Sequence, residues 1–156
     1  MKLLFPIWIV LLSLTGCSEK KDLGEISVTS TPIKKRQTKT HSQFIQIAYI
    51  DLFNKTITPQ RFNRAKQIFD SQGDDDINFR LFIKQLLDDP GIILPSKKFI
   101  QKDTEKFVVE SYLKFYGRRP NGYEKKLLID DIKRDQTVSA ATIYYILMTT
   151  EEYKMF

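Results

Sequence analysis

The chain has 156 residues, a formal net charge of +6, one cysteine and one histidine. A single cysteine excludes an internal disulfide framework, and a histidine zinc site or triad would have to be built without a second histidine. The basic excess is spread along the sequence rather than concentrated on one helix, which argues against nucleic-acid binding.

The first 16 residues have the pattern of a secretory signal peptide. Lys2 precedes an unbroken apolar run from Leu3 to Leu12, and small residues then lead into Cys17. The run is shorter than the roughly 20 apolar residues that a membrane-spanning helix needs. Residues 1–16 are therefore predicted to be removed by cleavage rather than kept as an anchor.

The string Leu14-Thr15-Gly16-Cys17 resembles the lipobox of bacterial lipoprotein precursors. The resemblance implies cleavage before Cys17, a glyceride on its thiol and acylation of the new N-terminus, for example with palmitate. It thus implies a membrane as the partner of the covalent lipid, and Ser18 favours the outer membrane of a two-membrane bacterium. The alternatives are an ordinary leader cysteine in a plain secreted protein and a buried thiol.

Residues 17–41 are expected to form a lipidated flexible tether. From Ser18 to Thr40 the sequence is polar and has no hydrophobic period, so it cannot bury enough surface to offset the cost of ordering. The tether contains a basic cluster, which is Lys34, Lys35, Arg36 and Lys39. This cluster either contacts anionic headgroups or an anionic envelope polymer, or is a solvated linker.

The folded part is expected to be all-α, with two tandem three-helix units. In the first unit, residues 42–90, apolar residues recur at three- and four-residue intervals in three segments. The segments are separated by capping and helix-breaking residues: Thr58-Pro59, Gly73-Asp74 and Pro90. A linker, 91–102, then leads to the second unit, 103–156, where the same pattern returns.

The acidic residues around Gly73 have two interpretations, metal binding and helix capping. Asp70, Asp74, Asp75 and Asp76 could suggest a calcium loop, but the alternating ligand spacing and closing glutamate of an EF-hand are missing. Carboxylates at the start of a helix complement its dipole. We therefore expect capping, with no metal and no cofactor.

A shift of 63 residues superimposes the two predicted units. It brings together Phe44 with Phe107, Tyr49 with Tyr112, Phe53 with Tyr116, Lys55 with Arg118, and Asp88-Asp89 with Glu151-Glu152. An internal duplication is the simplest account of these matches. Chance matching of amphipathic helices is the alternative.

The second unit also resembles a known family. The residues concerned are Tyr112, Tyr116-Gly117-Arg118-Arg119-Pro120, Glu124 and Thr150-Glu151-Glu152-Tyr153. This pattern is similar to a helical domain of unknown function in bacterial surface and envelope proteins, itself distantly similar to phycobilisome linker modules. The resemblance implies a binding or scaffolding module without known catalysis. The first unit departs from the pattern at Asn54-Lys55 and at Pro90.

Five residues of the second unit are predicted to form a structural clasp: Arg118, Arg119, Glu151, Glu152 and Tyr153. The first and third helices of an up-down-up bundle are parallel, so their ends lie side by side. An arginine can then meet a carboxylate in bidentate fashion. We expect Tyr153 to pack on Tyr112 or Tyr116, and Lys55 to meet Asp88-Asp89 in the first unit.

The function expected is that of a lipid-anchored envelope protein, without catalysis, that binds another envelope protein or polymer. An exposed aromatic patch would serve this purpose, and its candidates are Tyr123, Tyr144, Tyr145 and Phe156. The alternative is an envelope hydrolase that uses paired carboxylates such as Asp130-Asp131 or Glu151-Glu152. Adjacent carboxylates on a charged helix are more often a solvated face.

Overall fold

A computed structural model describes residues 37–71 and 73–155. The described residues all belong to one compact unit. The predicted signal peptide 1–16, the lipidation site Cys17 and most of the predicted tether lie outside the described residues, as does Phe156.

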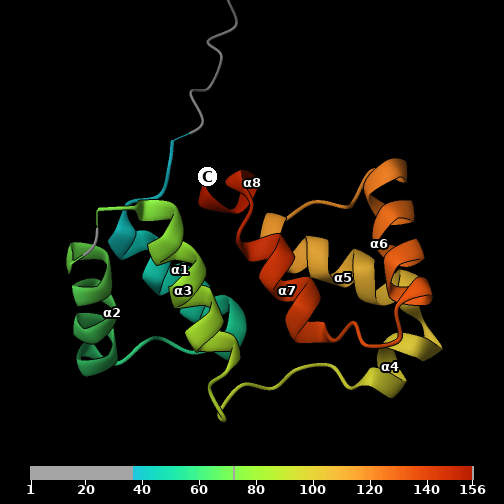
Figure 1. Cartoon of the computed structure of the whole chain (residues 1–156), viewed down its shortest axis with the longest axis horizontal. Helices are drawn as coiled ribbons and strands as arrows, with labels where there is room; N and C mark the ends of the chain where they lie inside the picture. The colour runs from blue at the N-terminus through green and yellow to red at the C-terminus, as the bar shows by residue number, and fades with distance from the viewer. Residues whose placement is uncertain (1–36, 72, 156) are drawn as a thin grey trace, which may run out of the picture. The chain divides into compact units, whose positions relative to one another are not determined.

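The described residues form helices and no strand, which confirms the predicted all-α class (Figure 1). The helices are α1 His41–Phe53, α2 Pro59–Ser71, α3 Asp75–Leu87, α4 Lys97–Lys102, α5 Thr104–Tyr116, α6 Gly122–Arg134, α7 Ala140–Met148 and α8 Glu151–Lys154. None of them combines the length and the apolar content that crossing a membrane would require.

Local capping residues determine where these helices begin. The Thr40 hydroxyl accepts a hydrogen bond from the Gln43 N–H, and the Gln43 side chain returns one to the Thr40 N–H, which makes a capping box at α1. The Asp74 carboxylate accepts from the N–H groups of Asp76 and Ile77 at the start of α3. The acidic residues before α3 therefore include a helix cap, as predicted.

The predicted linker 91–102 contains a helix that the sequence analysis missed. The Ser96 hydroxyl caps α4 by accepting from the Phe99 N–H at 3.3 Å, and Ile100 is only 2% exposed. The last predicted helix is also interrupted. It ends at Met148, and the Thr150 hydroxyl caps the separate short helix α8 by accepting from the Tyr153 N–H at 3.3 Å.

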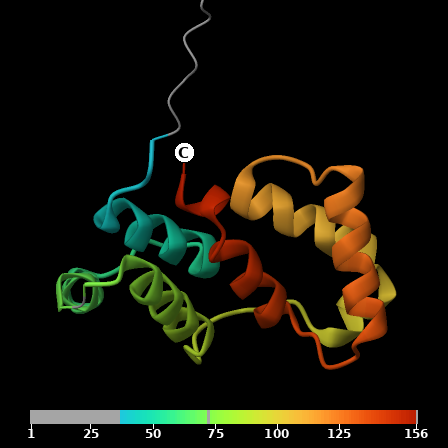
Figure 2. The ribbon, with the colours of Figure 1, turned by 45° about the horizontal axis from the view of Figure 1, so that its top comes forward.

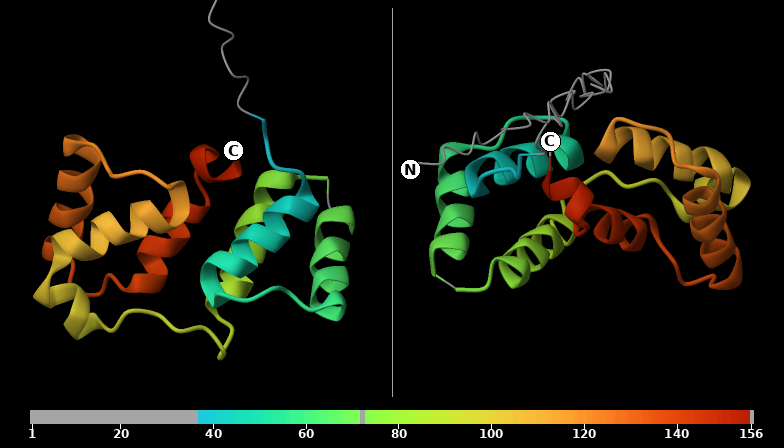
Figure 3. Two further views of the ribbon diagram at one scale, coloured as in Figure 1. Left: turned by 180° about the vertical axis from the view of Figure 1, so that it is seen from behind. Right: turned by 90° about the horizontal axis from the view of Figure 1, so that it is seen from above.

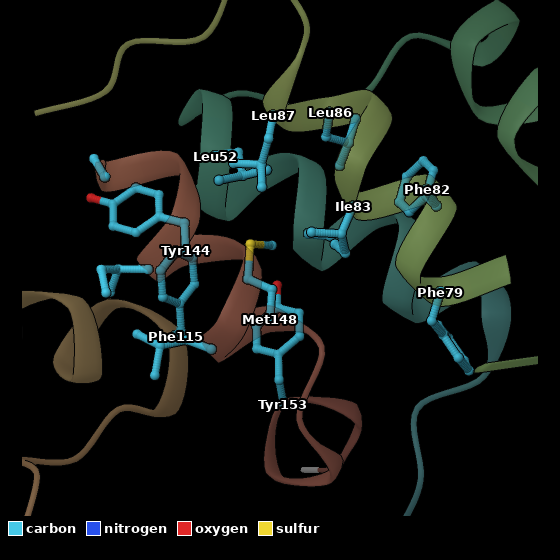
Figure 4. Packing of buried hydrophobic residues seen from close by; sticks show 14 of the residues in the cluster. Leu52, Phe79, Phe82, Ile83, Leu86, Leu87, Phe115, Tyr144, Met148 and Tyr153 are labelled. Atoms are coloured by element: carbon cyan, nitrogen blue, oxygen red, sulfur yellow. The ribbon is translucent and has the colours of Figure 1, made fainter. Parts of the chain in front are cut away.

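One hydrophobic core runs through both predicted three-helix units. The helix α7 passes between α1–α3 and α5–α6, and this arrangement is visible from three directions (Figures 2 and 3). Figure 4 shows the junction, where Met148 and Tyr144 of α7 lie in the same cluster as Leu52 of α1, Ile83 of α3 and Phe115 of α5. The duplication stays a prediction.

The residues just before α1 belong to the folded unit and not to a tether that extends to residue 41. The Lys39 N–H donates to the Lys154 carbonyl at 2.8 Å, and Thr38 forms an isolated bridge with Met155. The Lys39 ammonium donates to the Tyr153 carbonyl and lies 4.3 Å from the centre of the Tyr153 ring. The predicted tether boundary is therefore wrong by a few residues, because these contacts fix residues 38 and 39 against residues 153–155.

Candidate functional site

Arg118 is positioned by the end of α5. The helix ends at Tyr116, and Gly117 takes a left-handed conformation with φ of 66°, which glycine adopts without the penalty that a Cβ would bring. The Gly117 N–H donates to the Leu113 carbonyl at 3.1 Å and closes the last turn. Arg118 thus leaves the helix at its negative end, where a cation is favoured.

The guanidinium of Arg118 lies between two carboxylates. Its Nε and Nη2 atoms donate to the two oxygens of Glu152, at 2.6 and 2.7 Å. Its Nη1 and Nη2 atoms donate to the two oxygens of Glu124, at 2.9 and 2.8 Å. The remaining Nη1 proton points to the carbonyl of Arg119 at 3.2 Å. All five N–H donors of the side chain are therefore used within the chain.

Two tyrosines lie beside this guanidinium. The Cζ atom of Arg118 is 5.3 Å from the ring centre of Tyr112 and 5.6 Å from that of Tyr116. The Tyr116 hydroxyl bonds to the Leu147 carbonyl at 2.8 Å and to the Thr150 hydroxyl at 2.9 Å. Burial raises the pKa of Tyr116 to about 12, so this hydroxyl keeps its proton at neutral pH. The rings add a cation–π contact to the ionic one.

The electrostatics of the cluster favour the charged forms of its members. Hydrogen bonds that Arg118 donates to Glu124 and then to Glu152 raise the pKa of its guanidinium. The Arg118 hydrogen bonds in turn hold the pKa of the Glu124 carboxyl below its usual range, opposed by partial burial and helped by the Asn121 N–H. Glu124 thus has two tasks, because it also closes the capping box of α6 with Asn121.

This arrangement corrects the membership of the predicted clasp. Arg118 and Glu152 are joined as predicted, but the second carboxylate is Glu124 of α6 rather than Glu151. The Glu151 carboxylate instead accepts from the Lys154 ammonium at 2.8 Å, three residues along α8. Arg119 is exposed and contributes only its carbonyl. Arg118, Glu124 and Glu152 are called the arginine clasp below, and they tie the starts of α6 and α8 to the end of α5.

Tyr153 does not pack on Tyr112 or Tyr116. Its hydroxyl donates to the Asp51 carboxylate of α1 at 2.7 Å, and its ring centre lies 5.6 Å from Phe44 and 5.9 Å from Phe115. The side chain is 1% exposed. The prediction is wrong because α8 turns away from α7 at Thr150 and points Tyr153 toward α1.

Burial dominates the charges around Tyr153. It raises the pKa of Tyr153 and of the Asp51 carboxyl, and it lowers the pKa of the Lys39 ammonium, although the charge of Asp51 acts in the opposite direction on Lys39. Nothing in the sequence pattern pointed to this group. Its members are far apart in the chain and carry no common motif.

Lys154 of α8 is a second buried cation, after Lys39. It is 6% exposed, and its ammonium pairs with the carboxylates of Asp76 and Glu151. It also lies 5.1 Å from the centre of the Phe79 ring. The carboxylate of Asp76, one of the acidic residues considered for metal binding, is thus in an ion pair with Lys154. Among the residues that the structure describes, no group of three metal-ligating side chains occurs.

The equivalent of the clasp in the first unit differs from the prediction. The Asp89 carboxylate accepts from Arg61 of α2 at 2.8 Å and from the Gly91 N–H at 2.8 Å. The ammonium of Lys55 lies 5.8 Å from the Phe53 ring, and Asp88 is the C-cap of α3. The Gly91 N–H, then Arg61 and Lys55, lower the pKa of the Asp89 carboxyl, so Lys55 acts on Asp89 by its charge. The basic residue that bonds to Asp89 is nevertheless on the second helix and not at the end of the first.

The predicted aromatic patch is not a single surface. Tyr123 is 76% exposed, whereas Tyr144 is only 7% exposed and packs on Phe107 and Phe115. Tyr145 is half-buried against the core, and Phe156 lies outside the described residues. Tyr144 is therefore a core residue, because it lies on the face of α7 that meets α5.

The carboxylate pair on α6 is engaged in local ion pairs. Asp130 accepts from Lys126 at 2.6 Å, and Asp131 pairs with Arg134. Hydrogen bonding from Lys126 lowers the pKa of the Asp130 carboxyl, which is the opposite of what a general acid needs.

Comparison of the chain with models of protein families, with curated proteins and with solved structures found no match.

Proposed function

We propose that the protein is anchored in a bacterial envelope membrane, the outer one, by a lipid on Cys17. There it binds another envelope protein or polymer without catalysis of its own. The single observation that carries the proposal is the apolar run from Leu3 to Leu12 followed by Leu14-Thr15-Gly16-Cys17. A run of this length suits export and cleavage, and a thiol at that position suits attachment of a glyceride.

The arginine clasp supports a binding role over a catalytic one. Arg118 bonds to two carboxylates, and its five donors all have acceptors within the chain. It therefore has no donor left for the carboxylate or phosphate of a substrate. The arginine clasp links helices to one another, and a partner would bind elsewhere on the surface of the folded unit.

The lipid anchor is tested by replacing the thiol. Cys17→Ser should abolish metabolic labelling with a fatty acid, leave uncleaved precursor and release the chain from its lipid-dependent attachment. The matched control is Ser18→Ala, which leaves the thiol in place and should be labelled as the parent is. Unchanged labelling of Cys17→Ser would overturn the anchor.

The binding role is tested by mild cross-linking in intact envelopes, followed by affinity capture of the chain. A specific envelope component should be captured with the parent chain, and less of it with Cys17→Ser, because the anchor holds the body close to its partner. Capture that is equal for both chains would show that the anchor does not serve binding.

A further inference from the structure

The segment between α3 and the end of α4, residues 91–102, presents an apolar side chain to solvent. Ile93 is 91% exposed, the largest value among the exposed large hydrophobic residues of the described chain. Its neighbours Ile92 and Leu94 pack against the core. Ile93 therefore points outward between two neighbours that point inward. Residues 91–102 are called the α3–α4 strip below.

The strip is fixed at both ends. At its start the Asp89 carboxylate accepts from the Gly91 N–H at 2.8 Å, and the Asp89 carbonyl accepts from the Ile92 N–H at 3.1 Å. At its end the Ser96 cap and the buried Ile100 attach α4 to the body. The exposure of Ile93 is consequently a property of the folded unit.

The same strip also carries three cations, on α4. Lys97, Lys98 and Lys102 are exposed, and none of them is in a salt bridge with another described residue. The strip itself contains no acidic residue. Phe99, 38% exposed, lies three residues before Lys102 and so shares a face of α4 with it.

The end of α6 adds to the same charge. The Gln101 side chain donates to that of Gln136 at 2.7 Å, and Lys133 lies beside the same group, whereas Arg134 is paired with Asp131. The acidic residues that border the strip have local partners. Asp103 accepts from the Lys106 N–H at 3.0 Å, and Asp135 accepts from the Thr137 N–H at 2.8 Å while attracting Lys97.

We propose that the α3–α4 strip binds the surface of a bilayer that contains anionic phospholipids. Apolar side chains enter the boundary between headgroups and acyl chains, and lysines around them meet the phosphates, which is how interfacial segments bind. A soluble polyanion would use the lysines but gain nothing from Ile93 and Phe99. The strip lies on the side of the unit away from residue 37 and the C-terminal helix, so the described N-terminal segment leaves it uncovered (Figure 1).

The test uses the full chain with Ile93→Trp, reconstituted in vesicles. Trp8 is the only tryptophan of the sequence and lies in the predicted signal peptide, so a cleaved chain contains no other indole. The parent chain measured in parallel gives the background. In phosphatidylcholine vesicles with added phosphatidylglycerol, the emission of the new indole should shift to the blue and be quenched by brominated lipids. In pure phosphatidylcholine it should stay that of an exposed indole. Flotation with the neutral vesicles reports the Cys17 anchor separately, so failure of one proposal leaves the other standing.

Charge and apolar contributions are separated by two further variants. Lys97→Gln with Lys98→Gln and Lys102→Gln should lower the ratio of docked to free strip about 100-fold, since each lysine near the surface contributes about fivefold. The matched control, Lys55→Gln with Lys84→Gln and Lys114→Gln, removes the same charge elsewhere and should leave the ratio within a few-fold of the parent's.

Ile93→Ser, made in the parent sequence without the tryptophan, should reduce the protection from hydrogen exchange that anionic vesicles give to the strip. Equal spectral shifts in neutral and anionic vesicles, or no shift in either, would overturn the proposal. It would also be overturned if inorganic polyphosphate protected the strip as well as vesicles do and Ile93→Ser made no difference, because the partner would then be a polyanion.

Discussion

The hydroxyl of Tyr153 donates a 2.7 Å hydrogen bond to the carboxylate of Asp51, which lies 102 residues earlier in the chain. The bond joins α8 to α1, and thereby links α4–α8 to α1–α3. The ring of Tyr153 meets Phe44 on one side and Phe115 on the other, so one side chain contacts the cores of both groups.

Tyr153→Phe is expected to lower the free energy of unfolding by about 2 kcal/mol, because a partly buried carboxylate loses a charge-assisted hydrogen bond while the ring stays in place. Urea denaturation followed by circular dichroism measures the change. Tyr123→Phe is the matched control, since Tyr123 is 76% exposed and should change stability by less than about 0.5 kcal/mol. Equal effects of the two substitutions would contradict the role of the Asp51 contact.

Arg118→Ala is expected to lower the melting temperature by about 4 °C, corresponding to about 1 kcal/mol, and to leave partner capture unchanged. The effect is modest because the Arg118 side chain is 38% exposed and solvent screens the ion pairs. Arg118→Lys should not restore stability, since an ammonium cannot meet two carboxylates in bidentate fashion. Arg119→Ala is the control. Loss of capture with unchanged melting would place Arg118 in the binding surface.

Acid should weaken the protein through the arginine clasp. The Glu124 carboxyl has a folded-state pKa below the reference value of 4.5, so its contribution is present above pH of about 4.5 and is lost as the pH falls through the folded-state pKa. The stability difference between the parent and Glu124→Gln should therefore shrink as the pH is lowered from 6 to 3. Urea midpoints at each pH give the difference. A constant difference would show that the ion pair does not cause the pKa shift.

Asp51 should behave in the opposite way. Its folded-state pKa is raised from 3.8 by burial, so the stability it contributes is present below pH of about 3.8 and is lost as the pH rises through the folded-state pKa. Asp51→Asn should thus gain stability relative to the parent between pH 3 and pH 7. The same urea series reports it, and a relative loss over that range would mean that the carboxylate is stabilised as an anion.

Removing residues 1–39 is expected to cost more stability than removing residues 1–36. The longer deletion takes away the backbone bond of Lys39 to Lys154 and the contact of its ammonium with Tyr153. Each hydrogen bond contributes about 1 kcal/mol, so the chain that begins at Thr40 should be less stable by about 2 kcal/mol. Thermal melting of the two chains compares them. Identical melting would show that residues 37–39 belong to the tether after all.

The helix ends were predictable where local chemistry determines them. The Asp74 cap, the Thr58-Pro59 start of α2 and the glycine at the end of α5 all operate within a few residues. The helix α4 was missed because its six residues are too few to display a hydrophobic period. The break at Thr149-Thr150 was missed because the apolar pattern continues into α8, and only the cap of the Thr150 hydroxyl reveals it.

The arginine clasp was half predictable. The expected parallel arrangement of the first and third helices predicted that Arg118 would meet Glu152. It did not predict which second carboxylate binds the guanidinium. Glu124 was visible as part of a family pattern, and the geometry of the turn after Gly117 decides that it reaches the guanidinium. The contact of Tyr153 with Asp51 was beyond prediction, because it depends on how one helix group packs against the other.

The place of Tyr153 also sets a sequence of events during synthesis. Asp51 and Phe44 leave the ribosome early, while Tyr153 follows 102 residues behind Asp51. Until it arrives, α1 to α3 can pair among themselves, yet the wall of their core beside Phe44 stays open to water and the Asp51 carboxylate is hydrated. Closure of that wall therefore waits for α8, and until then the first helices are the less protected part of the chain, whether at the ribosome or after export.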